Sequence, residues 1–129
     1  MNHVAPSHQT QPTRQPAQQP EQTAQRVFDN ADDCARRLKA LSNPTRLMAA
    51  CAMLAGGPLS VGTIALHLTG LTDPPLSQSA LSRHLAVMRH AGVVTTRREA
   101  QTIFYSLSPD ARAVVHILAR ALDGGDTPA

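Results

Sequence analysis

The sequence has few aromatic residues: its 129 residues include no tryptophan, one tyrosine and two phenylalanines. Hydrophobic residues still make up 42% of the chain, so a core must be built from Leu, Ala, Val, Ile and Met. A core of this kind favours packed helices over a β-sandwich. The length suits a single domain.

Cysteine and long apolar runs are also scarce. The two cysteines, Cys34 and Cys51, are too few for a disulfide-stabilised secreted scaffold. The longest apolar run, residues 47–55, is too short to span a membrane. The N-terminus lacks the apolar segment of a secretory signal. We therefore expect a cytoplasmic protein with no membrane partner.

The net charge of +3 is concentrated in one stretch, Ser77–Leu107, which holds four arginines and one glutamate. The remainder of the chain is neutral overall. A focused cationic patch indicates a polyanionic partner. A solvated basic face is the common alternative, so the local structure around the patch has to decide between them.

The first half of this stretch predicts a helix over residues 77–91. Leu81, Leu85 and Met88 recur at i, i+4 and i+7 and would be buried. The opposite face is polar, cationic and free of acids, and consists of Gln78, Ser79, Ser82, Arg83, Ala86 and Arg89. Gln, Ser and Arg can read base edges, and the small Ala86 allows a close approach to a groove.

The second half predicts a β-hairpin. Residues 93–98 and Thr102–Leu107 are rich in side chains that suit strands, and Gly92 fits the left-handed position after a helix. Arg97 and Arg98 lie near the hairpin tip. A helix that can enter a groove, followed by a basic hairpin, is the outline of a winged helix-turn-helix.

The N-terminal part divides into a tail and two helices. Residues 1–25 are rich in Gln and Pro, and we expect them to be disordered. A first helix is predicted from about residue 23 to residue 41, with Val27, Cys34, Leu38 and Leu41 at helical spacing. Asn43-Pro44 begins a second helix, apolar nearly all round, that ends at Gly56-Gly57-Pro58.

A short third helix, residues 61–68, is predicted after a Ser60 cap, with apolar contacts from Ile64, Leu66 and Leu68. Ser108-Pro109-Asp110 begins an apolar last helix that stops at Gly124. The fold class is thus mainly α with a two-stranded β-wing. The expected domain is 26–123, followed by a flexible C-terminus at 124–129. The first and last helices would pair two copies of the chain as a homodimer.

Three segments resemble the ArsR/SmtB family of bacterial repressors, especially its HlyU/NolR-like branch: Leu38–Leu47, Leu59–Ala65 and Leu76–Ser108. The resemblance implies a homodimer that binds imperfect palindromes in double-stranded DNA. It also implies that the helix at 77–91 enters the major groove. Residues 69–75 form a longer segment than this branch usually has before that helix.

The resemblance also implies site residues. Base or phosphate contacts would come from Gln78, Ser79, Ser82 and Arg83, with His84 and Arg89 as supports. Wing contacts to the minor groove or backbone would come from Arg97, Arg98, Gln101 and Thr102. For His84 a packing role is the alternative, because it lies at the edge of the apolar stripe.

Family members that sense metals place ligands where this chain has none. Ser60-Val61-Gly62 stands where a Cys-x-Cys would be, and Asp110-Ala111-Arg112 lacks a nearby His, so that His116 stands alone. We therefore expect no metal and no cofactor. The alternative is a metal-responsive repressor with a sparse, non-standard site formed by Cys34, Cys51 and His116.

Cys51 stands where persulfide- and peroxide-responsive relatives place one of two cysteines. Their partner cysteine is on the last helix, where this chain has none, so Cys34 is the one possible partner. A disulfide or polysulfide bridge between them would be a redox switch. The alternative is that both are small buried hydrophobic residues, in a regulator that responds to no ligand.

An enzyme is not expected, because the sequence has no nucleophile elbow, phosphate-binding glycine loop or paired carboxylate motif. A winged helix used only for protein contacts would more often expose aromatic or large aliphatic side chains. The sequence therefore predicts a dimeric DNA-binding transcriptional regulator that acts as a repressor or an anti-silencer.

Overall fold

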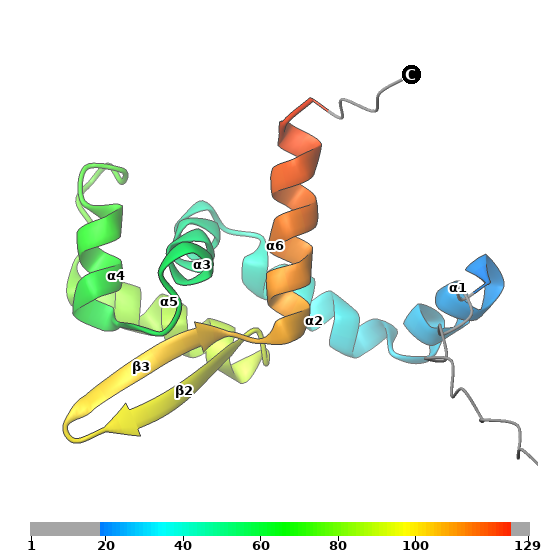
Figure 1. Cartoon of the computed structure of the whole chain (residues 1–129), viewed down its shortest axis with the longest axis horizontal. Coiled ribbons are helices and arrows are strands. Elements are labelled where there is room, and N and C mark those ends of the chain that lie inside the picture. Colours follow the sequence, from blue (N-terminus) through cyan, green and yellow to red (C-terminus); the bar gives the residue numbers. More distant parts are fainter. Residues whose placement is uncertain (1–18, 125–129) are drawn as a thin grey trace, which may run out of the picture. The chain divides into compact units, whose positions relative to one another are not determined.

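The structure, a computed structural model, describes residues 19–124 (Figure 1). Within this range the elements are α1 (Pro20–Asp29), α2 (Ala31–Leu41), α3 (Pro44–Gly56), β1 (Leu59–Ser60), α4 (Val61–Leu68), α5 (Gln78–His90), β2 (Val94–Glu99), β3 (Thr102–Leu107) and α6 (Pro109–Leu122). None of these helices is long and apolar enough to cross a lipid bilayer. Residues 1–18 of the predicted disordered tail and residues 125–129 of the predicted flexible C-terminus lie outside the described range.

The chain divides between Ala31 and Asp32 into two compact units, so α1 is described by itself. The prediction of one helix from residue 23 to 41 is wrong, because α1 ends at Asp29. The Asn30 side chain donates a hydrogen bond to the Arg26 carbonyl at 2.8 Å. Asn favours such helix ends because its amide competes with the helical backbone pattern. The predicted tail is also too long, since Pro20 begins α1.

Four helices in the second unit begin at a residue whose side chain caps the helix. The side chains of Asn43, Ser60, Ser77 and Ser108 each accept a hydrogen bond from the backbone N–H three residues later, at 3.1–3.2 Å. Each cap stabilises its helix by about 1 kcal/mol. The beginnings of α3, α4, α5 and α6 are therefore fixed locally.

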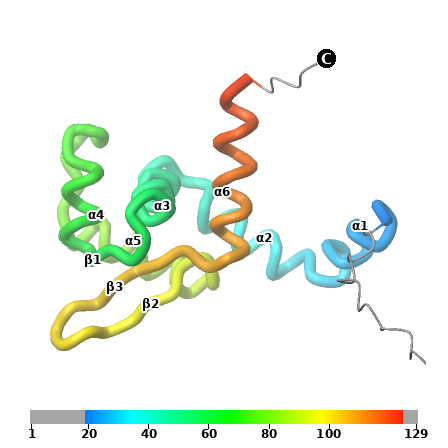
Figure 2. Tube along the Cα trace, viewed as in Figure 1, coloured from blue at the N-terminus to red at the C-terminus, as the bar shows by residue number. Residues whose placement is uncertain are grey.

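The core forms where α3, α4 and α5 meet. Leu81, Leu85 and Met88 of α5 are fully buried with Met53 of α3 and Ile64 of α4. Helix α3 is central in this unit, because it contacts α4, α5, α6 and β3 (Figure 2). Two details differ: Cys51 on α3 is exposed, and Leu66, predicted to pack from α4, is 75% exposed.

The sheet has three antiparallel strands in the order β1-β3-β2, so the prediction of two strands missed β1. Leu59 and Ser60 pair with Tyr105 and Phe104 of β3. A two-residue strand is too short to show alternation in its sequence. The β2–β3 hairpin, called the wing below, projects from the rest of this unit (Figure 1).

A tight turn joins α5 to the wing. Gly92 has a φ of +79°, which its missing side chain permits. The Gly92 and Val93 N–H groups donate to the Arg89 and Met88 carbonyls, both at 3.0 Å. This is the Schellman arrangement, and it confirms the predicted role of Gly92. Helix and wing are thus connected without a flexible linker.

Candidate nucleic-acid interface

The exposed face of α5 carries five of the residues predicted to contact DNA. Burial of the apolar stripe fixes the rotation of the helix, so the opposite side faces solvent. The predicted residues that are exposed are Gln78, Ser79, Ser82, Arg83 and Arg89. Ala86, which is also exposed, lies between Arg83 and Arg89 in the helix. No acidic residue occurs between Ser77 and Ala91. The face therefore combines cationic groups with side chains able to hydrogen-bond to base edges.

The helix that precedes α5 lies close to its N-terminus. A Cβ added to Gly62 of α4 would lie 4.0 Å from the Gln78 side-chain nitrogen. The long segment 69–77 between the two helices does not displace α4, because Ile64 and Leu68 are buried in the core that holds α5. Leu76 packs against this core and its N–H donates to Thr72 Oγ1 at 3.2 Å.

The predicted wing residues gather at the hairpin tip, where Arg97, Arg98, Gln101 and Thr102 are all exposed. Arg97 pairs across the hairpin with Phe104, and Arg98 with Ile103. Since successive residues of a strand point to opposite faces, the two arginines point in opposite directions. Arg97 also lies 3.1 Å from the Glu99 carboxylate, a weak pair because both side chains are exposed.

His84, also predicted at the interface, is half-buried and faces α3. Its Nδ1 lies 3.3 Å from Arg46 Nη1. Arginine only donates hydrogen bonds, so Nδ1 accepts and the ring proton is on Nε2. Burial lowers the pKa of His84 below its usual 6.5, and the charges of Arg46 and Arg83 lower it further. His84 therefore helps to position α5.

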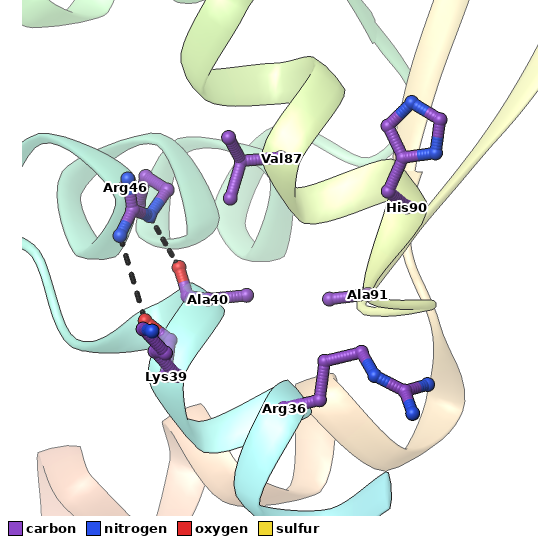
Figure 3. A pocket seen from close by; sticks show the side chains of 7 residues that line it. All are labelled: Arg36, Lys39, Ala40, Arg46, Val87, His90 and Ala91. Atoms are coloured by element: carbon purple, nitrogen blue, oxygen red, sulfur yellow. Dashed lines mark hydrogen bonds between the residues drawn. The ribbon is translucent and has the colours of Figure 1, made fainter.

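Arg46 was not among the site residues predicted from the sequence. Its Nε donates to the Ala40 carbonyl and its Nη2 to the Lys39 carbonyl at 3.4 Å (Figure 3). Together with the His84 contact, this side chain joins the end of α2 to α3 and α5. A signal was present, because a single cation in the otherwise apolar helix Pro44–Gly56 needs partners when it is partly buried.

A second link joins α2 to α6. Asp110, in the first turn of α6, accepts a hydrogen bond from Arg37 Nη1 at 2.8 Å. The Arg37 side chain also lies 3.1 Å from Asp33 on its own helix. The two helices predicted to form the dimer interface are thus tied to each other within one chain.

The cysteines are more accessible than one prediction assumed. Cys51 is exposed and Cys34 is half-buried, so the expectation that both are buried hydrophobic residues is wrong. His116 is exposed on α6. Within residues 19–124, no three His, Cys, Asp or Glu side chains are grouped closely enough to hold a metal ion.

Comparisons with known proteins agree on one family. Residues 43–96 match the model of the bacterial regulatory proteins of the arsR family. The chain is 48% identical over 84 residues to the transcriptional activator HlyU of Vibrio cholerae, covering 64% of this chain and 71% of HlyU. It is 43% identical over 103 residues to the nodulation protein NolR of Rhizobium meliloti, covering 78% and 77%.

A solved structure has the same fold. The homodimeric winged helix-turn-helix DNA-binding domain Mb0332 from Mycobacterium bovis, described as a possible ArsR-family transcriptional regulator, aligns with a TM-score of 0.62 at 26% identity. The alignment covers 83% of this chain and 90% of that domain. The helices and the wing described above are therefore arranged as in a winged helix-turn-helix.

The lowered pKa of His84 predicts a pH-dependent stability. The folded protein favours the neutral ring, so below about pH 6.5 the unfolded chain binds more protons and the free energy of unfolding falls. His84→Asn keeps an acceptor for Arg46 but does not titrate. In denaturant titrations at fixed protein concentration between about pH 7 and 5, this variant should lose less stability than the wild type.

His116→Asn is the matched control, because His116 is exposed on α6. It should show the pH dependence of the wild type. Identical pH profiles for His84→Asn and the wild type would show that the His84–Arg46 contact does not couple protonation to folding.

Proposed function

The chain belongs to the ArsR family of bacterial transcriptional regulators, and from this premise we propose that it binds double-stranded operator DNA as a homodimer and represses the adjacent promoter. In this proposal α5 enters the major groove and the wing contacts the neighbouring minor groove or backbone. A symmetric dimer reads a symmetric site, so the operator would be an imperfect palindrome.

One observation carries the proposal: the polar and cationic residues of the acid-free helix α5 are exposed, while three other side chains of the same helix are fully buried. An α-helix with its side chains is about 10–12 Å across, which fits the roughly 12 Å width of the major groove. Arg83 can donate two hydrogen bonds to guanine O6 and N7, and Gln78 can pair with adenine. Ser79, Ser82 and Ala86 leave room for this approach.

The wing supports the same mode of binding. Because Arg97 and Arg98 point to opposite faces of the hairpin, a wing lying flat on the backbone would use only one of them. A tip inserted into the minor groove would bring both to DNA, one toward each strand. Gln101 and Thr102 lie at the same tip and would follow it into the groove.

The homodimer is supported by apolar side chains that the single chain leaves in water. On α6, Ile117 is 66% exposed and Leu122 is 86% exposed, and on α2 Leu38 is 58% exposed. Large exposed apolar side chains that lie together mark interaction surfaces. The Arg37–Asp110 pair is exposed and therefore weak, but it places the first turn of α6 beside α2. A second copy would cover the apolar side chains of both helices.

Arg83→Ala tests the major-groove contact. If Arg83 reads a base, the variant should lose about 1–3 kcal/mol of binding free energy on the operator and much less on random DNA. Fluorescence anisotropy on a fragment of the protein's own upstream region and on random DNA measures both. Arg120→Ala, which removes an exposed arginine of α6, is the matched control. An equal loss on the two DNAs would instead assign Arg83 to a phosphate.

Ile117→Asp tests the dimer. Placing a carboxylate in an apolar interface should convert the protein to monomers in sedimentation experiments and weaken operator binding at least tenfold, since each half-site would bind alone. Leu66→Asp puts the same charge on an exposed apolar position of α4 and should leave the dimer intact. If the Ile117→Asp protein is still a dimer and binds the operator with wild-type affinity, Ile117 does not lie in the dimer interface.

We further propose that oxidation of Cys51 switches DNA binding. The exposure of Cys51 supports this, because an accessible thiol can react whereas a buried one cannot. Peroxide converts a thiolate to a sulfenic acid, which condenses with a second thiol, here Cys34, to a disulfide with release of water. On α3, Cys51 belongs to the helix that packs against α5.

Operator binding before and after peroxide or polysulfide treatment measures this switch. The treated wild type should release DNA and form a Cys34–Cys51 bridge detectable by mass spectrometry, while Cys51→Ser should keep binding. Cys34→Ser should lose the bridge as well. A wild-type protein whose affinity is indifferent to both oxidants would make the cysteines structural residues.

A further inference from the structure

A pocket of about 310 Å³ lies between α2 and α5 (Figure 3). It is lined by Arg36, Lys39 and Ala40 of α2, Arg46 of α3, and Val87, His90 and Ala91 at the end of α5. In Figure 3 the Ala40 and Ala91 side chains point toward one another across it. The pocket lining therefore combines the apolar side chains of Ala40, Val87 and Ala91 with basic side chains.

The charge of this pocket is of one sign. Among the described residues that line it there is no carboxylate. Arg36 lies 3.4 Å from Asp33 on the same helix, a weak pair because both side chains are largely exposed. Within residues 19–124 Lys39 has no ion-pair partner. Arg36 and Lys39 are thus available to an anion, while Arg46 is held by the Ala40 and Lys39 carbonyls and forms the wall.

The position of the pocket along α5 indicates which anion could bind in it. Arg83, Val87 and His90 follow one another at i, i+4 and i+7, so they form one row along the flank of α5. A helix that fills a major groove has a phosphate strand along each flank, because helix and groove have nearly the same width. The opposite flank begins at Gln78, beside α4. The pocket therefore opens on the flank along which one DNA strand would run.

We propose that this pocket binds a backbone phosphate of the operator through Arg36 and Lys39, so that α2 is part of the DNA interface. The inference rests on the proposed DNA-binding function and extends the interface beyond α5 and the wing. A phosphate held between α2 and α5 fixes how deeply and at what angle α5 lies in the groove. The contact carries no sequence information, since phosphates are the same at every base pair.

The double variant Arg36→Gln, Lys39→Gln tests this contact. Each phosphate contact releases about 0.9 counterion. The slope of log affinity against log salt should therefore become shallower by about one, with a loss of roughly five- to tenfold at 0.1 M salt. The loss should be equal on operator and random DNA. Arg112→Gln, Arg120→Gln on α6 removes the same charge elsewhere and should leave the slope unchanged.

A charge-preserving exchange, Arg36→Lys with Lys39→Arg, separates the effect of lost charge on DNA binding from any effect of the substitutions on folding. It should keep the wild-type salt slope, and circular dichroism and sedimentation should show that all three double variants are folded dimers. If the Arg36→Gln, Lys39→Gln variant has the same salt slope as the α6 control, α2 does not contact the DNA backbone. A loss confined to the operator would also overturn the proposal. A wild-type protein that binds no DNA would instead refute the proposed function itself.

Free anions share the chemistry of a backbone phosphate, so a second arm titrates inorganic phosphate onto the protein without DNA at constant ionic strength. If wild-type protein binds phosphate, the Gln variant does not, and the salt slopes of the two are equal, the pocket serves a small anion. That result would overturn the assignment to DNA. A shallower slope in the Gln variant supports the assignment.

Discussion

The rotation of α5 about its own axis is the constraint on which the rest of the interface depends. Leu81, Leu85 and Met88 are fully buried against α3 and α4. Truncating a buried side chain of this size typically costs about 2–5 kcal/mol, so a rotation that exposed all three would cost much of a small domain's stability. The same packing that holds the helix therefore determines which of its residues meet solvent.

Arg46 extends this constraint from α5 to α2. Its guanidinium binds the last carbonyls of α2 and contacts the neutral ring of His84. The position of α2 matters twice in the proposed function, because its Leu38 face would join the second subunit and its Arg36–Lys39 side would face the DNA backbone. The half-buried Arg46 thus connects the proposed dimer surface on α2 to α5, the proposed recognition helix. The distance between the recognition helices of a dimer sets the spacing of the half-sites.

The features that depend on neighbouring residues were predictable from sequence. The four caps, the buried stripe of α5, the Gly92 turn and the hairpin all follow from patterns within a few residues. The opposite directions of Arg97 and Arg98 also follow once the hairpin register is known. The break at Asn30 was missed because the apolar spacing continues from Val27 to Cys34 across it.

Features that depend on residues far apart in the chain were not predictable. Arg46 and His84 are 38 residues apart in sequence, and no local pattern pairs them. The exposure of Cys51 and Leu66 depends on which faces of α3 and α4 meet other elements, and an apolar helix does not specify that by itself. The pocket between α2 and α5 is likewise lined by residues that are far apart in the sequence.

Chemical footprinting of guanine N7 tests the central claim most directly. The DNA would be an operator selected from random sequences by binding to the protein. Dimethyl sulfate methylates guanine N7 in the major groove and adenine N3 in the minor groove. If α5 of each subunit lies in the major groove, bound protein should protect guanine N7 in two clusters about one helical turn, or a multiple of it, apart. Guanine N7 that stays fully reactive while adenine N3 is protected would contradict the account, because the protein would then bind through the minor groove alone.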